Sequence, residues 1–118
     1  YDSLGESERA IEYHQQALAM QKQIYGEQPD PDVASSLMGL GNAYHALGEC
    51  ERAIEYHQQS LAMKKQIHGD RSHSSIANCL VNLGNAYHSL GEYERAIDYY
   101  QQSLIMKKQV HGNRSHLD

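Results

Sequence analysis

Histidines are the residues of this chain whose type and spacing most suggest chemistry. A His-Gly-x-Arg-Ser-His segment occurs twice, bounded by His68 and His73 and again by His111 and His116. Imidazole nitrogens are good zinc ligands, but a zinc site needs three or four donors and each segment supplies two. The corresponding earlier segment has tyrosine and aspartate in place of the two histidines. We therefore predict no metal site and no cofactor.

Paired carboxylates are the second candidate for chemistry. Glu51 and Glu55 are four residues apart, as are Glu94 and Asp98. Such pairs can act as general acid and base in an enzyme. Here an arginine follows the first acid of each pair, which is typical of a solvated, charged helix face. The sequence also shows no nucleophile beside a base and no phosphate-binding glycine loop. We therefore expect no catalytic residues and no enzyme activity.

The composition limits the class of protein and its partners. The chain of 118 residues has no Trp, no Phe and a formal net charge of -5. Phosphate binding needs a basic stripe, so this balance argues against nucleic acid as a partner. No apolar run approaches the roughly 20 residues of a membrane span, and no signal peptide is visible. We interpret Cys50 and Cys79 as free thiols of an intracellular, cytoplasmic protein.

These residues recur because the whole sequence recurs with a period of 43 residues. Gly48 and Gly91 mark one such step, with no insertion or deletion between the copies. Between residues 37–73 and 80–116, 28 of 37 positions are identical. A regular period of this size indicates a stack of small units rather than one closed core. We divide the single array into a partial repeat at 1–29 and full repeats at 30–72 and 73–118.

The first part of each full repeat has the pattern of a helix. Leu37, Leu40 and Tyr44 recur on one helical stripe. Asp30 is a suitable cap at the start, and Gly48 suits the left-handed residue that ends a helix. The pattern predicts helices at 31–47 and at about 74–90.

The second part of each repeat predicts a longer helix. Ala53, Tyr56 and Met63 lie on its apolar stripe, and Gly69 ends it. Glutamates near its start and lysines near its end suit the helix dipole. These signals predict helices at 6–25, 49–68 and 92–111, with residues 1–4 as the end of a preceding first helix. The array therefore consists of five antiparallel helices.

One set of residues recurs at fixed places in each repeat, and the first full repeat has it at Leu37, Leu40, Gly41, Tyr44, Gly48, Ala53, Ser60 and Leu61. This pattern resembles the tetratricopeptide repeat over essentially the whole chain. The period exceeds the common one of about 34 residues, and is similar to the long repeats of kinesin light chain, nephrocystin-like and Pins-type scaffolds. The resemblance implies an all-α, right-handed solenoid of antiparallel helix pairs with about two and a half repeats.

The chain departs from that pattern at the aromatic residue of the second helix. Histidine takes the place at His14 and His57, and an aromatic ring returns only at Tyr100. We interpret these two histidines as packing residues.

The resemblance implies a concave groove, lined by the first helices, that holds an extended or helical peptide. The first-helix face opposite the apolar stripe carries Asn42 and Asn85, one repeat apart. An asparagine can donate to a peptide carbonyl and accept from a peptide N–H. The alternative is that both are ordinary solvated helix residues. The predicted groove residues are Asn42, Asn82, Asn85, His45, His88, Met38 and Val81.

Two functions fit these observations. The first is a protein–protein interaction module that binds a peptide or partner protein and forms a fragment of a longer scaffold. The alternative is a structural, self-assembling repeat fragment, consensus-derived or designed, without a dedicated ligand. The first of the long helices lacks its partner and the last lacks a follower. We therefore predict self-association through these uncapped terminal helices.

Overall fold

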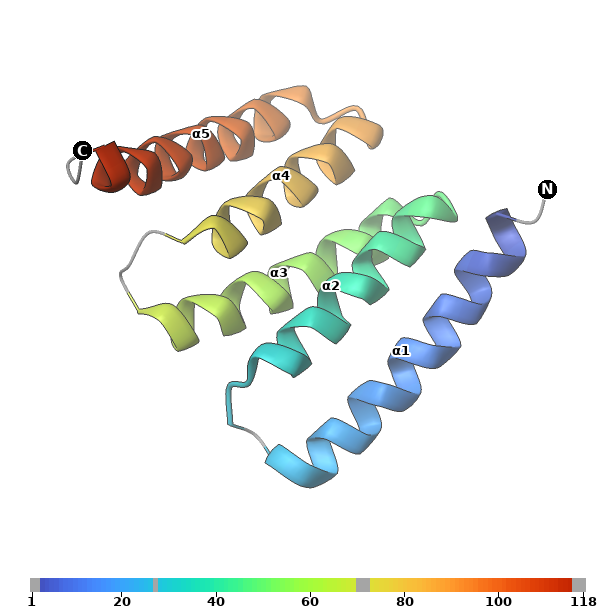
Figure 1. Cartoon of the computed structure of the whole chain (residues 1–118). Helices are drawn as coiled ribbons and strands as arrows, with labels where there is room; N and C mark the ends of the chain where they lie inside the picture. Colours follow the sequence, from blue (N-terminus) through green and yellow to red (C-terminus); the bar gives the residue numbers. More distant parts are fainter. Residues whose placement is uncertain (1–2, 27, 70–72, 116–118) are drawn as a thin grey trace.

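The chain folds as a stack of antiparallel helices. The computed structural model describes residues 3–26, 28–69 and 73–115, and these form five helices and no strand. Consecutive helices run antiparallel, and the two ends of the chain lie at opposite ends of the stack (Figure 1). This confirms the predicted all-α fold. The helices are α1 (Ser3–Tyr25), α2 (Pro31–Ala46), α3 (Cys50–His68), α4 (Ser74–Ser89) and α5 (Tyr93–Ser115).

The two first helices, α2 and α4, begin with different caps. The Asp30 side chain accepts a hydrogen bond from the Asp32 N–H of α2 at 2.8 Å, as the sequence predicted. At α4 the Nδ1 atom of His73 accepts one from the Ser75 N–H at 3.0 Å. A ring nitrogen of His73 thus takes the capping role that a carboxylate oxygen has at Asp30.

Glycines end the helices where the next helix folds back. Gly48 and Gly91 both adopt a φ of 84°, and Gly26 and Gly69 adopt 68° and 66°. Side chains other than glycine rarely adopt this left-handed region, so the four turns depend on glycine. The predicted C-terminal ends of α1, α2, α3 and α4 are therefore confirmed to within a residue or two.

Two predicted boundaries are wrong. α1 runs through Gly5 and α5 runs through Gly112, where the sequence predicted a turn and a helix end. Neither glycine has a positive φ. A turn there would need another helix packed against it, and within the described residues no helix precedes α1 or follows α5. The interpretation of residues 1–4 as the end of a preceding helix is thus wrong for the two that are described.

The core is a thin apolar layer between neighbouring helices. Leu40 and Leu83 are fully buried at equivalent positions of the two repeats. In each full repeat a buried serine of the second helix donates a hydrogen bond to a backbone carbonyl of the first helix. Ser60 donates to the Ala34 carbonyl at 2.9 Å, and Ser103 donates to the equivalent carbonyl of α4 at 3.0 Å. These hydroxyls are satisfied, so small polar residues permit close helix approach without a desolvation cost.

Tyrosine pairs brace the two full repeats. The rings of Tyr44 and Tyr56 stack with centroids 5.5 Å apart, and those of Tyr87 and Tyr99 repeat the arrangement at 5.5 Å. Arg52 lies over the Tyr44 ring, and the hydrogen bond that it donates to the Tyr44 hydroxyl raises the pKa of the guanidinium. Tyr56 and its equivalent Tyr99 therefore pack as the apolar stripe predicted, whereas Tyr13, the equivalent residue of α1, is 69% exposed.

Cys50 and Cys79 are buried and form no disulfide, which agrees with their prediction as free thiols. Of the helices in the described ranges, none combines the length and the apolar character needed to cross a bilayer.

Candidate functional site

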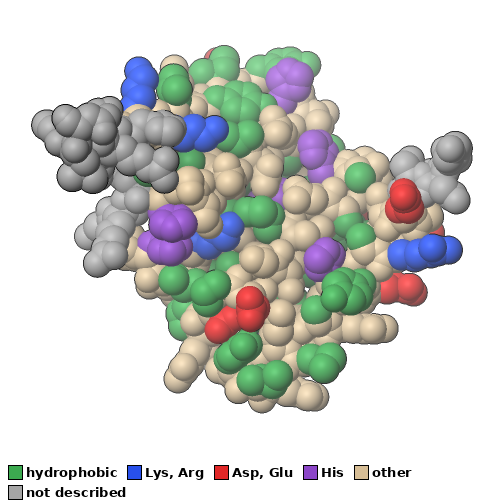
Figure 2. Space-filling view, in the orientation of Figure 1, with side chains coloured by type: hydrophobic (Ala, Val, Ile, Leu, Met, Phe, Trp, Pro, Cys, Tyr) green, Lys and Arg blue, Asp and Glu red, His purple; other side chains and the backbone are tan. Residues whose placement is uncertain are grey.

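The predicted groove residues all lie on the two first helices. Three of them, Asn42, Asn85 and His88, are exposed, and the other four are half-buried. Several histidine side chains are visible across the face of the molecule shown in Figure 2, with hydrophobic side chains among them. Helix α2 carries Met38, Asn42 and His45, and helix α4 carries Val81, Asn82, Asn85 and His88.

A direct hydrogen bond joins the two first helices. The Nε2 atom of His45 and the Oγ atom of Ser89 are 2.9 Å apart. The residue equivalent to Ser89 in the first full repeat is Ala46, which has no hydroxyl. This exchange between the two copies therefore makes a link between α2 and α4. His45 helps to fix the spacing of the polar faces that carry the asparagines.

An open hollow lies beside Asn42, between α1 and α2, with a volume of about 420 Å³. Its second wall is α1, which the sequence analysis did not assign to the groove. The 43-residue register that pairs His14 with His57 and Tyr100 was the signal that α1 carries an equivalent surface. The hollow is lined by Glu6, Ser7, Ala10, His14, Gly39, Asn42, Ala43 and Ala46.

Glycines on the first helices make room for rings from the second helices. A Cβ added to Gly41 would lie 2.7 Å from Cε1 of His57, and one added to Gly84 would lie 2.7 Å from Cε1 of Tyr100. A Cβ added to Gly39 would likewise collide with the His14 ring. The packing role predicted for His14 and His57 is confirmed, because their rings fill the space beside Gly39 and Gly41.

His57 is a fully buried histidine without a hydrogen bond on either ring nitrogen. Burial, together with the smaller effect of the charges of His45 and Lys64, lowers its pKa to about 4. The ring is therefore neutral near pH 7, and protonating it requires a buried charge without a partner.

Metal ligation finds no support in the geometry of the described residues. They contain no group of three or more His, Cys, Asp or Glu placed to hold an ion. The His68 and His73 rings stack with centroids 3.9 Å apart and an interplanar angle of 15°. Stacked rings do not converge on a shared ion, and the cap of α4 already uses Nδ1 of His73. His116 lies outside the described residues, as does the side chain of His111.

Comparison with known proteins agrees with this geometry. The sequence model of the tetratricopeptide repeat matches residues 1–66 and 32–109. Among solved structures, the fold is similar to that of BtubC (BKLC) from P. vanneervenii, with a TM-score of 0.82 and 26% sequence identity. The match covers 95% of this chain and 44% of that one, so the chain spans less than half the length of BtubC.

No curated protein sequence matches the chain significantly. Repeats of the matched type are non-catalytic and generally mediate protein–protein interaction. The family match extends over nearly all of the chain, and the helix pairs, turn glycines and packing glycines agree with it. The chain belongs to the tetratricopeptide repeat family.

Proposed function

We propose that the chain is a protein-interaction module that holds an extended segment of a partner protein along the polar face of α2 and α4. The observation that carries the proposal is the pair Asn42 and Asn85, both exposed and one repeat apart. An extended segment has backbone N–H and C=O groups that need partners when it leaves water. Two amides on rigid helices supply such partners, and the bond between His45 and Ser89 holds those helices together.

The partner that we propose is a protein rather than a nucleic acid or a membrane. The net charge of -5 opposes binding to phosphates or anionic lipids. Two buried free thiols suit a reducing compartment, so we place the module in the cytoplasm as a fragment of a longer scaffold. Fractionation of cells that express the chain with its native flanking sequence tests this; recovery from the oxidising secretory pathway contradicts it.

The binding proposal is tested by selecting a displayed library of random 12-residue peptides on the wild-type chain. The strongest peptide is then titrated against the double variant Asn42→Ala/Asn85→Ala. We expect its affinity to fall by at least about tenfold, since each lost amide leaves a backbone group unpaired. The matched control is Gln59→Ala/Gln102→Ala, which removes two exposed amides from α3 and α5. Equal affinity of both variants, with helicity intact, contradicts the proposal.

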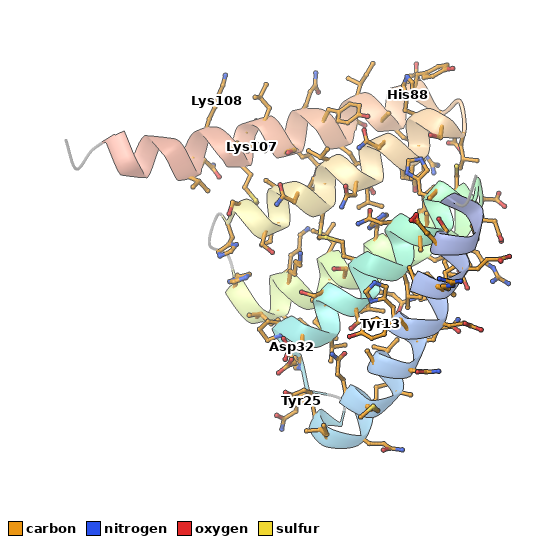
Figure 3. The ribbon with its side chains drawn as sticks, turned by 45° about the vertical axis from the view of Figure 1, so that its right-hand side comes forward. Tyr13, Tyr25, Asp32, His88, Lys107 and Lys108 are labelled. Atoms are coloured by element: carbon orange, nitrogen blue, oxygen red, sulfur yellow. The ribbon has the colours of Figure 1, made fainter. Side chains whose placement is uncertain are left out.

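Self-association is a second candidate function, favoured by the exposed apolar side chains of the outer helices. On α1, Tyr13, Met20 and Ile24 are 69%, 63% and 70% exposed. On α5, Ile97 and Leu104 are 52% and 54% exposed. Figure 3 shows Tyr13 and Tyr25 on α1 and the two lysines Lys107 and Lys108 on α5, at opposite sides of the stack. We propose that a second copy covers these apolar faces.

Sedimentation equilibrium decides between a monomer and an assembly. We expect the apparent mass to rise with protein concentration and to stay monomeric in Ile97→Lys/Leu104→Lys. Lysine at these exposed positions adds charge to the apolar face of α5 and changes no residue of α2 or α4. A wild-type chain that stays monomeric at millimolar concentration contradicts the second candidate and leaves the first untouched.

A further inference from the structure

The two predicted groove asparagines, Asn42 and Asn85, differ in the hydrogen bonding of their side chains. The Oδ1 atom of Asn85 accepts a hydrogen bond from the Tyr100 hydroxyl at 2.5 Å. Asn42 occupies the equivalent position of the first full repeat, and within the described residues its side chain forms no hydrogen bond. The residue equivalent to Tyr100 is His57, whose two ring nitrogens have no partner. One amide is therefore held by a neighbouring helix and the other is not.

The difference arises from how far each ring reaches. Both rings lie against the glycine that precedes the asparagine, so the His57 ring covers Gly41 and the Tyr100 ring covers Gly84. A phenol carries its hydroxyl beyond the ring, and this hydroxyl reaches the amide oxygen of the next residue. An imidazole has no group beyond its ring, and that of His57 does not reach Asn42.

The hydrogen bond sets the chemistry of the Asn85 amide. An asparagine carries one acceptor oxygen and one NH₂ group with two donors. Donation from Tyr100 occupies one lone pair of the oxygen and fixes the orientation of the amide, so the NH₂ group of this exposed residue is directed away from the Tyr100 hydroxyl. The amide is already held in one orientation, so little side-chain entropy is lost when a ligand binds. Asn42 keeps the freedom to donate or accept, and loses that entropy on binding.

We propose that Tyr100 is a positioning residue that makes Asn85 the pre-oriented hydrogen-bond donor of the groove. Its NH₂ group takes a backbone carbonyl oxygen of the extended segment, while Asn42 adapts to whichever backbone group lies opposite. This inference rests on the proposed peptide-binding function. It gives the groove two unequal ends, with a fixed donor on α4 and an adaptable amide on α2.

Isosteric substitutions test the donor role. Asn85→Asp keeps the oxygen that accepts from Tyr100 and removes the NH₂ donor, and Asn42→Asp makes the same change at the adaptable site. The probe is the selected 12-residue peptide, acetylated and amidated at its ends and chosen without charged side chains. We expect Asn85→Asp to weaken binding by about tenfold or more and Asn42→Asp by about threefold or less. Equal losses, or a loss larger at Asn42, overturn the inference.

Tyr100→Phe tests the positioning role, because it removes only the hydroxyl. We expect a loss of affinity of about three- to tenfold at an unchanged melting temperature. Side-chain ¹⁵NH₂ relaxation in the free chain gives a readout that needs no ligand. The Asn85 amide should be more ordered than that of Asn42, and should become as mobile in Tyr100→Phe.

The two measurements separate the inference from the function on which it rests. If the wild-type chain enriches no peptide in the selection, the binding proposal is wrong. The mobility of the Asn85 amide then still decides whether Tyr100 orients it. An Asn85 amide as mobile as Asn42 in the wild-type chain overturns the positioning role, even when the peptide binds tightly.

Discussion

The two full repeats, α2–α3 and α4–α5, share a backbone and differ in how their polar groups are satisfied. Both end their first helix with a glycine at a φ of 84° and stack a tyrosine pair at 5.5 Å. In the first repeat a buried histidine has two unpaired ring nitrogens, and the nearby Asn42 amide has no hydrogen bond to the described residues. In the second repeat a tyrosine hydroxyl donates to the equivalent amide, that of Asn85. A repeat can thus keep its shape while a single exchange changes the chemistry of its surface.

The neighbours of the two repeats account for the rest of the contrast. Helix α3 is covered by α4, whereas no described helix covers the outer face of α5. The same residue type therefore has two environments: Ile54 is 8% exposed and Ile97 is 52% exposed. Position in the array, as well as sequence, decides what a residue contributes to stability.

The largest difference in unfolding free energy between equivalent substitutions in the two repeats should occur at these two isoleucines. Ile54→Ala removes buried atoms from the core cluster that includes Leu83 and Tyr87, and we expect it to cost about 3 kcal/mol of unfolding free energy. Ile97→Ala should cost less than about 1 kcal/mol, because its side chain is already half in water. Urea unfolding of both variants measures the difference, and equal losses would show that α5 is covered in solution.

Acid should destabilise the first repeat through His57. Its pKa falls from 6.5 to about 4 on folding, so the unfolded state binds more protons between these values. Stability is complete above pH 6.5 and declines as the pH falls toward 4, by about 2.5 kcal/mol at about pH 4.5. His57→Phe should lose this part of the pH dependence. Parallel stability curves for the variant and the wild-type chain would contradict the neutral, buried state of this ring.

Alanine substitutions at Gly41 and Gly84 should change the stability of the two repeats by different amounts. Gly41→Ala puts a methyl group against a fully buried ring that has no room to move. We expect a net loss of about 1–2 kcal/mol, because overpacking outweighs the gain of about 1 kcal/mol in helix propensity. Gly84→Ala should cost less than Gly41→Ala, since the half-buried Tyr100 ring can swing outward, at the loss of its hydrogen bond to Asn85. Thermal unfolding followed by circular dichroism measures both; a larger loss at Gly84 would reverse the ranking.

The smallest loss of stability should come from removing the hydrogen bond between His45 and Ser89, which links the two repeats. Ser89→Ala removes the hydroxyl that bonds His45 and restores the residue type found at Ala46. We expect a loss of about 0.5 kcal/mol, typical of a partly exposed hydrogen bond. Calorimetry should show a slightly lower melting temperature, with Ser35→Ala on the exposed side of α2 as a matched control. An unchanged melting temperature would mean that packing alone sets the spacing of α2 and α4.

Much of the fold follows from local signals. Asp30 acts through its side chain on the nearby Asp32 N–H, and Gly48 acts through its own backbone, so the bounds of α2 could be predicted from sequence. Gly5 and Gly112 carry the same residue type in the same register, yet both lie inside helices. A glycine permits a turn without requiring one, and the turn forms only where another helix packs beyond it.

The candidate site was predictable in position more than in detail. The period placed Asn42 and Asn85 on equivalent exposed faces, and the structure has them there. The exchange of His57 for Tyr100 was visible in the sequence, but its consequence depends on the reach of one hydroxyl across two helices. Sequence periodicity carries no information about such distances, and for this reason the unequal asparagines emerge only from the structure.

The stacked tyrosines give the chain its own optical reporters. The sequence contains nine tyrosines and no tryptophan, so tyrosine emission is not lost to energy transfer to an indole. The Tyr44–Tyr56 and Tyr87–Tyr99 rings are nearly parallel, at interplanar angles of 1° and 6°. Parallel rings at this separation couple their electronic transitions, which should give each full repeat a near-ultraviolet dichroism band. Replacing one member of a pair with phenylalanine would silence one repeat and let the unfolding of the other be followed alone.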